Sequence, residues 1–528
     1  MTCGEAICLK GYGMIWQMMK KEFLLSLMTF KFVVGVIVCI VLTAVFVPIL
    51  ARDYQERLKT YRDNVTRNEA ELRVVKVYKN VAPTAFRTPS VLSVLSGGLE
   101  KRIADAAVVE LDKVPKIHGA ASQGNPYQSV FPVFDMSLIF TIVLSILALL
   151  VAYDAVSGER ERGTLKLILS GATRRYQVLL GKFLAGLFVL VIPVTITFLV
   201  GLVILQSFPM IRLSLSDWVQ IALMYVASLV FVSAMYNVGL LFSCLAGKSA
   251  ISLVLGLFVW ILFAVIVPNG SVYLAAEIQE LEPQETIDAQ VASLKKQYQA
   301  ELDEIHIDEP SERARSDARD AFGRGYYRLI NRSYLEYLQE CNRRQFPLTV
   351  EYADRFWEAE RGRFDSLCEQ RRLADRLASI SPMSLYDGTM SALAGTDLAA
   401  FQRFMDGVRT YRAQTVEYVR LKTNGFSSPS FFTPCTDEEV EEYERFLEQA
   451  RHVKSQEEAA ALYEGVRTRW EKAFANTPSL DLRDFPAFTM PKALGGIGRA
   501  VPCLVSLIVV NLLFFGLSYV GFIKYDVR

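Results

Sequence analysis

Charged and apolar residues alternate closely in residues 154–182, DAVSGERERGTLKLILSGATRRYQVLLGK. The segment starts with the mixed-charge run 159–162, and Gly163 and Thr164 form a break or a cap. Its apolar residues are Leu165, Leu167, Ile168 and Leu169, and Arg174 and Arg175 follow them. A partner docking here could take the apolar residues into a groove and pair with the charges. A membrane-surface loop without a partner would look the same, so the residue pattern leaves both interpretations open.

Groups that could carry out catalysis are sparse. The histidines His118, His306 and His452 are far apart, and the sequence contains neither a CxxC nor an HExxH pattern, so it predicts no metal site. ATP hydrolysis would need a GxxxxGK[ST] loop after a strand. Residues 242–249, FSCLAGKS, have Phe242 in place of the first glycine and form a tight turn between apolar segments. We therefore expect that this chain is not an enzyme and binds no cofactor.

The elements that must position the 154–182 segment are apolar. The chain of 528 residues carries 57 Lys+Arg and 56 Asp+Glu, and its mean hydropathy is +0.25 although 21% of its residues are charged. These figures coexist because apolar and charged residues are segregated, as is typical of a membrane protein with soluble insertions. The balanced charge argues against a nucleic-acid partner, and the lipid bilayer is the expected environment.

Six segments are long enough to cross ~30 Å of hydrocarbon as helices that rise about 1.5 Å per residue. None has a charged residue at its centre. We predict an all-α integral membrane protein with six transmembrane helices and a large, mainly α-helical extracytoplasmic domain between the fifth and sixth. The predicted helices cover residues 32–51, 136–153, 178–206, 217–246, 250–268 and 501–523.

Lysine and arginine in the short loops predict the orientation. Basic residues cluster in four cytoplasmic parts, namely residues 1–31, 154–177, the turn at 248 and 524–528. Residues 52–135 and 269–500 are then extracytoplasmic. We expect the first of these segments to begin helical and become loop-like, and the second to form helical hairpins broken near 381–384 and 395–397. Residues 15–30 are interpreted as an interfacial helix or as the end of the first transmembrane helix, and Met14 is an alternative start.

Polar side chains within the predicted transmembrane helices are few. Such residues either hold helices together through hydrogen bonds or line a substrate path. The residues concerned are Thr195, Thr197, Ser233, Tyr236, Asn237 and Asn511.

The residue order of the 154–182 segment resembles the signature of ABC-2 type transporter permeases, roughly S-G-E-R-E-x-G-T-L followed by a short apolar helix and an arginine. The matching residues are Ser157, Gly158, Glu159, Arg160, Glu161, Gly163, Thr164 and Leu165. Shorter stretches resemble other family motifs, namely Lys21–Phe23, Gly181–Lys182, Ser381–Pro382, Ala394–Thr396 and Asp484–Phe488.

The resemblance implies a permease subunit whose six helices form one half of a transport pathway, and it favours export. It implies a separate ABC ATPase subunit that holds ATP and Mg and docks on the coupling loop, with residues 159–169 as the coupling helix and Arg174 and Arg175 after it. It also implies a second permease copy, or a similar permease, in a bacterial plasma (inner) membrane. The segment 269–500 is larger than in typical members. A mechanotransmitter or scaffold that moves this domain without transporting a substrate therefore stays an alternative.

Overall fold

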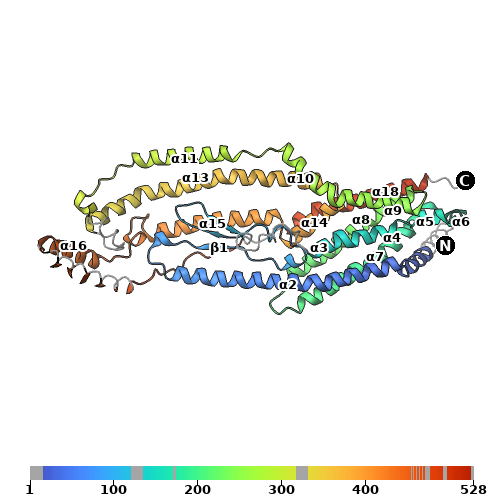
Figure 1. Cartoon of the computed structure of the whole chain (residues 1–528), viewed down its shortest axis with the longest axis horizontal. Helices are drawn as coiled ribbons and strands as arrows, with labels where there is room; N and C mark the ends of the chain where they lie inside the picture. The colour runs from blue at the N-terminus through green and yellow to red at the C-terminus, as the bar shows by residue number, and fades with distance from the viewer. Residues whose placement is uncertain are drawn as a thin grey trace, which may run out of the picture.

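The computed structural model describes residues 16–119, 135–170, 174–316, 331–453 and 496–524, together with most residues from 455 to 490. The molecule is elongated and mainly helical (Figure 1). Among the described residues, six helices are long and apolar enough to cross a membrane, which confirms the predicted number. Met14, as an alternative start, lies outside the described residues. We call these six helices the bundle.

The helices of the bundle pass between two ends. The first described helix and Lys524 lie at the terminal end, and most of the described residues outside the bundle lie beyond the opposite, distal end (Figure 1). The helices are α2 (Phe30–Arg73); α3 (Met136–Ile139), continued by a π-helical turn (Phe140–Leu144) and α4 (Ser145–Ala152); α7 (Arg175–Gln206); α8 (Leu215–Leu245); α9 (Ser249–Ile261), continued by a π-helical turn (Leu262–Ile266) and α10 (Val267–Ile278); and α18 (Gly496–Ile523).

Helix α2 includes both the first predicted transmembrane segment, residues 32–51, and the helical start that was expected for the segment after it. It has 44 residues, which is about 66 Å of helix and roughly twice the hydrocarbon thickness. Its polar half contains no glycine or proline after Pro48, and Arg57 pairs with Asp53 one turn earlier, as helix-stabilising pairs do. Residues 16–27 form a separate helix, because the chain breaks at Met28 and Thr29 before α2 begins.

Helix α8 lies at the centre of the bundle and packs against α4, α7, α9 and α18. Small residues let its neighbours approach closely, as in many membrane bundles. A Cβ on Gly186 of α7 would lie only 2.2 Å from the ring of Tyr236, and one on Gly239 would lie 2.7 Å from the Cβ of Ala152. The α7–α8 and α4–α8 contacts therefore both depend on glycine.

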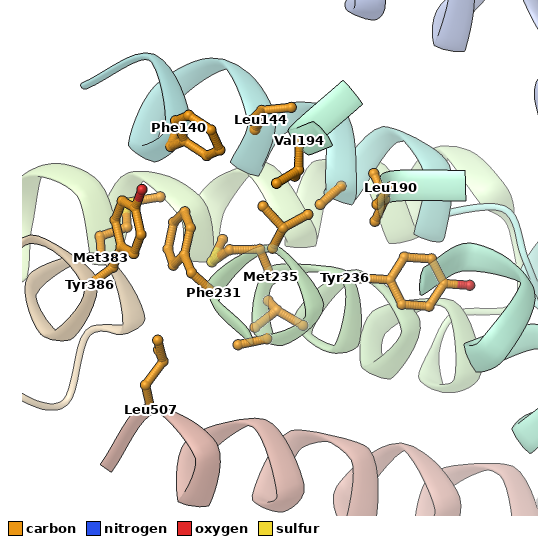
Figure 2. Close-up of a cluster of buried hydrophobic side chains, with 14 of the residues drawn as sticks. Phe140, Leu144, Leu190, Val194, Phe231, Met235, Tyr236, Met383, Tyr386 and Leu507 are labelled. Carbon is orange, nitrogen blue, oxygen red and sulfur yellow. The ribbon is translucent and has the colours of Figure 1, made fainter. Parts of the chain in front are cut away.

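A short helix packs into the bundle at its distal end. After α13 (Arg332–Ala378), α14 (Pro382–Ala394) packs between α8 and α18 (Figure 2). The Tyr386 ring stacks on Phe231 with centroids 4.5 Å apart, and its hydroxyl lies 2.9 Å from the hydroxyl of Ser228. The break at Ser381 was predicted from the sequence, but the insertion of the following helix into the bundle was not.

The remaining helices and one sheet form what we call the protruding section. Helix α11 (Gln284–Glu304) runs antiparallel to α13, and α15 (Leu398–Lys422) and α16 (Asp437–His452) follow. Strands β1 (Thr84–Phe86), β2 (Ala104–Val108) and β3 (Lys116–Gly119) form an antiparallel sheet in the order β1-β2-β3. The sequence prediction of a loop-like stretch missed these strands, because β2 consists largely of alanine, a residue depleted in strands.

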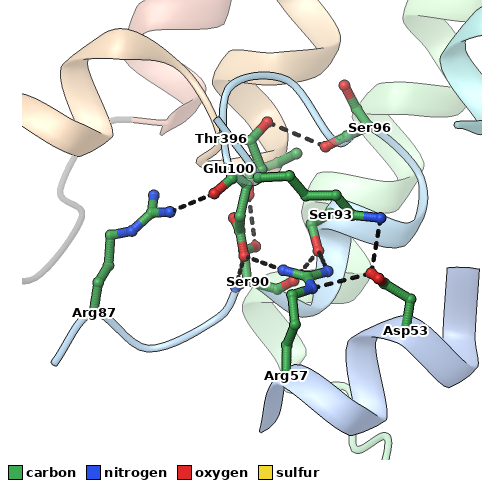
Figure 3. A network of polar contacts seen from close by, with 10 residues as sticks. Asp53, Arg57, Arg87, Ser90, Ser93, Ser96, Glu100 and Thr396 are labelled. Atoms are coloured by element: carbon green, nitrogen blue, oxygen red, sulfur yellow. Dashed lines mark hydrogen bonds and ion pairs between the residues drawn. The ribbon is translucent and has the colours of Figure 1, made fainter. Parts of the chain in front are cut away.

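Polar contacts join the protruding section to the bundle. Arg57 of α2 pairs with Glu100 at 3.0 Å and donates to the hydroxyl of Ser93 (Figure 3). The hydroxyl of Thr396, between α14 and α15, donates to the carbonyl of Ser96. Arg499 at the start of α18 makes two hydrogen bonds to Asp397. These contacts fix α2, α14, α15 and α18 relative to one another at the distal end.

Candidate coupling loop at the terminal end

Residues 154–170 and 174–177 lie at the terminal end of the bundle, and the first of these stretches contains two short helices, α5 (Ser157–Glu161) and α6 (Thr164–Ser170). Gly163 separates them with φ +75°, a conformation that glycine adopts without the strain of a side chain. The expected break at Gly163 is therefore present, and the residues expected to form the coupling helix, 159–169, belong to two short helices.

The start of α5 is hydrogen-bonded to a side chain of α8. The Ser243 hydroxyl oxygen accepts hydrogen bonds from the backbone N–H of Val156 at 2.9 Å and of Ser157 at 3.0 Å. The first N–H groups of a helix have no partner within it and need such acceptors. Ser157 is fully buried, and its own hydroxyl donates to the carbonyl of Tyr153. The start of the motif is thus part of the bundle's packing.

Glu159 faces a buried lysine on α7. The Lys182 ammonium lies 2.8 Å from Glu159 and 3.2 Å from Glu22 of the helix at 16–27, and only 2% of the Lys182 side chain is exposed. A buried ammonium requires such partners because leaving water is costly for a charge. The hydroxyl of Tyr236 donates to the carbonyl of Lys182. One lysine therefore connects the N-terminal helix, α5, α7 and α8.

The next two residues hold the turn between α8 and α9. Arg160 donates to the carbonyl of Ala246, just after the end of α8, at 3.0 Å. A carboxylate oxygen of Glu161 accepts from the Ser249 N–H at 3.2 Å and from the Ser249 hydroxyl at 2.9 Å, at the start of α9. A cation at a helix C-terminus and an anion at a helix N-terminus are both electrostatically favourable.

The opposite side of the loop faces outward. Arg162, Thr164, Lys166 and Leu167 are exposed, and 74% of Leu167 is accessible. Leu165 is fully buried, while Ile168 and Leu169 are half-buried and pack on the bundle core. The expected apolar face is therefore divided, with Leu165 inside and Leu167 outside.

The two arginines that follow α6 contact the start of α7 and the end of α18. The N–H of Arg174, just before α7, donates to the side-chain oxygen of Gln177. Arg175 donates to the carbonyl of Ile523 at the end of α18. The loop region is thus also connected to the last helix of the bundle.

Most of the polar residues singled out within the helices contact neighbouring helices. Asn237 of α8 donates to the side-chain oxygen of Asn511 of α18 at 2.5 Å, and Asn511 donates to the hydroxyl of Ser233 at 3.1 Å. The hydroxyl of Thr195 lies 2.8 Å from that of Tyr225, and Thr197 is fully buried. These contacts hold helices together, and a role in a substrate path stays a prediction.

Sequence reasoning missed the partners of the motif. Ser243, Ser249 and the Ala246 carbonyl lie in or beside the 242–249 stretch, which was considered only as a nucleotide loop. The sequence did offer one indication of these contacts, because the 242–249 turn and the basic 154–177 segment were predicted on the same side of the membrane. Among the described residues, no group of three or more His, Cys, Asp or Glu side chains could hold a metal ion.

Comparison with known proteins assigns the family. The family model described as "ABC-2 family transporter protein" matches residues 16–527. The chain belongs to the ABC-2 transporter family. Together with its six long apolar helices, this makes it a multi-pass membrane protein.

Two curated proteins are similar to part of the chain. Both are called "Probable ABC transporter permease protein NosY". The one from Stutzerimonas stutzeri is 42% identical over 82 residues, and the one from Pseudomonas aeruginosa is 40% identical over 82 residues. The match covers 15% of this chain and spans about 30% of the length of each relative.

Proposed function

We propose that this chain is the membrane-spanning permease subunit of an ATP-binding cassette transporter. It moves a substrate, most simply outward, with energy from ATP that a separate subunit hydrolyses together with Mg. The proposal rests above all on the two-sided coupling loop. Glu159, Arg160 and Glu161 attach the loop to the bundle, while Leu167 is exposed on its surface.

The outer side of the loop suits a docking partner. Leu167 is a single exposed apolar side chain on α6, and the exposed cations Arg162 and Lys166 flank it. A groove with an apolar floor and an acidic rim on the ATPase would complement this arrangement. From the basic loops at the terminal end we infer that the coupling loop and both chain ends lie on the cytoplasmic side.

The other proposed partners follow from the surface of the bundle. The outward faces of α2, α9 and α18 expose large apolar side chains along their length, including Ile37, Phe258 and Leu512. Lipid covers such faces in a membrane, and a second copy of this chain or a similar permease would cover part of them. We place the assembly in a bacterial plasma (inner) membrane.

The docking site can be tested with a matched pair of substitutions. The chain is co-expressed with a candidate ABC ATPase and reconstituted in nanodiscs, and the affinity of the two proteins is measured. Leu167→Asp should weaken binding at least about tenfold, since a buried apolar anchor is worth roughly 1–2 kcal/mol or more. Leu421→Asp, on an exposed leucine of the protruding section, should leave the affinity unchanged. Equal effects of both substitutions, or no binding by the wild type, would refute the proposal.

One observation favours a second function, in which ATP hydrolysis moves the protruding section and nothing crosses the membrane. Helix α2 is unbroken, and Lys31 pairs with Asp154 beside the coupling loop while Arg57 pairs with Glu100 at the distal end. Spin labels at the exposed residues Leu199 of α7 and Leu421 of α15 test this function. If the protruding section moves, the distance between the two labels should change when ATP and vanadate trap the ATPase. An unchanged distance would exclude this second function.

A further inference from the structure

Three consecutive residues of the coupling loop contact three different helices of the bundle. Glu159 pairs with Lys182 of α7, Arg160 donates to the carbonyl of Ala246 after α8, and Glu161 accepts from Ser249 of α9. Side chains on consecutive helical residues point about 100° apart. A single turn of helix can therefore reach three neighbours at once.

The contacts differ in kind. Glu159 binds a side chain, the buried Lys182 ammonium, whereas Arg160 and Glu161 bind groups at helix ends. These groups follow the end of their helix closely, because the Ala246 carbonyl and the Ser249 N–H belong to the backbone and the Ser249 hydroxyl lies two bonds from it. A displacement of α5 would therefore act on the ends of α8 and α9 through Arg160 and Glu161, and on α7 through the side chain of Lys182.

Hydrogen bonds from α8 and α9 connect the α8–α9 turn to other helices of the bundle. Its Asn237 holds Asn511 of α18, and Trp260 of the α9 helix donates to Ser145 at the start of α4. Movement of the α8–α9 turn would therefore reach the last and the second spanning helices by direct hydrogen bonds.

We propose that Glu159, Arg160 and Glu161 are positioning residues with separate targets, and that Glu161 transmits the ATPase-driven movement specifically to the α8–α9 turn. The inference rests on the proposed function. It goes beyond docking, because these three side chains contact the bundle, whereas the docking site is the exposed Leu167.

Hydrogen exchange measured by mass spectrometry on the permease–ATPase complex in nanodiscs tests this division. Exchange is followed in residues 246–256 and, separately, in residues 175–186, with and without ATP and vanadate. The wild type should show a nucleotide-dependent change in both segments. Glu161→Ala should lose at least half of the change in 246–256 and keep the change in 175–186, with the ATPase still bound.

Two further variants separate transmission from a general loss of structure. Glu161→Gln keeps an oxygen that can accept from Ser249 and should restore the change in residues 246–256. Glu285→Ala, on an exposed glutamate in the first turn of α11, should behave like the wild type.

The possible failures are distinguishable. Absence of a bound ATPase with the wild type refutes the proposed function itself. A bound ATPase with no nucleotide-dependent change in residues 246–256, or a change that survives Glu161→Ala, overturns the role of Glu161 and leaves docking intact. Equal loss in both segments with Glu161→Ala contradicts the separate targets.

Discussion

The two ends of the bundle are held by different kinds of contact. At the terminal end, Glu159, Arg160 and Glu161 each reach a different helix through a single charged group. At the distal end, α14 buries Tyr386 and Met383 among the side chains of the bundle core. The distal end is thus continuous with the core, whereas the terminal end consists of discrete attachments that a partner can load from outside.

This difference predicts where stability resides. Burying an aromatic ring removes a large apolar area from water and adds packing contacts. A polar contact beside water contributes less, because the unfolded groups are hydrated. Substitutions of buried core side chains at the distal end should therefore lower the free energy of unfolding most, and those at Glu159, Arg160 and Glu161 should chiefly affect coupling.

The largest effect is expected for Tyr386→Ala. The substitution removes the stacking on Phe231 and leaves a cavity between α8 and α14, so the free energy of unfolding should fall by about 3–5 kcal/mol. Equilibrium unfolding in detergent measures the loss. Tyr386→Phe keeps the ring and loses only the hydroxyl contact to Ser228, at about 1 kcal/mol. A similar cost for both variants would show that α14 is not part of the core.

The buried carboxyl of Asp135 gives the distal end a pH dependence. Burial raises the pKa of Asp135 to about 6, nearby Asp387 adds to the rise, and the N–H groups of Gly97 and Leu138 oppose it. A raised carboxyl pKa means that the native state holds its proton longer than the unfolded state does. Its contribution is fully present below about pH 4 and is lost as the pH rises through about 6.

The free energy of unfolding of the wild type, relative to Asp135→Asn, should therefore fall by up to about 3 kcal/mol between pH 4 and pH 7. Parallel curves for the two proteins over this range would contradict the buried, proton-retaining carboxyl. Unfolding in detergent at several pH values provides the measurement.

At the terminal end, Lys182→Ala measures how much the buried ion pairs of Lys182 contribute to the free energy of unfolding. Breaking a buried ion pair costs roughly 3–5 kcal/mol, but Glu22 and Glu159 are partly exposed and water can solvate them. We expect a loss of about 2–3 kcal/mol in the free energy of unfolding. Glu22→Gln, which keeps an acceptor for Lys182, should cost under about 1 kcal/mol. A loss for Lys182→Ala above that of Tyr386→Ala would reverse the contrast between the two ends.

The smallest effect concerns the polar contacts of the distal end. Arg499→Gln removes two hydrogen bonds to Asp397 in a partly exposed pair and should cost about 1 kcal/mol. Arg483→Gln serves as the control, because 91% of its side chain is exposed and its partner Asp481 is two residues away. Equal thermal midpoints for the two variants would show that this contact adds nothing to the packing of α14 and α18.

The sequence allowed the six helices to be located, because runs of apolar residues such as 501–523 carry their own signal. The partners of Arg160 and Glu161 could not be predicted, since they lie 86 and 88 residues further along the chain. No local periodicity relates such positions. The motif could thus be found from its residue order, but its contacts only from the packed bundle.

Hydropathy alone could not predict that helix α14 packs into the bundle. It has 13 residues, too few to cross a membrane, so the sequence placed it with the soluble helices. Its burial follows from the fit of Tyr386 against Phe231 and Ser228, which depends on side chains 155 and 158 positions away along the chain. The long polar half of α2 was likewise expected to be helical, but its continuity with the first spanning helix was not.

Site-specific photocrosslinking tests the difference between the two ends most directly. A benzoylphenylalanine is placed either at Leu167 in the coupling loop or at Tyr273 near the end of α10, both of which are exposed. Each variant is irradiated in nanodiscs with the bound ABC ATPase. A crosslink to the ATPase is expected from position 167 and none from position 273. A crosslink from 273 but not from 167 would place the ATPase at the distal end and exclude docking on the coupling loop.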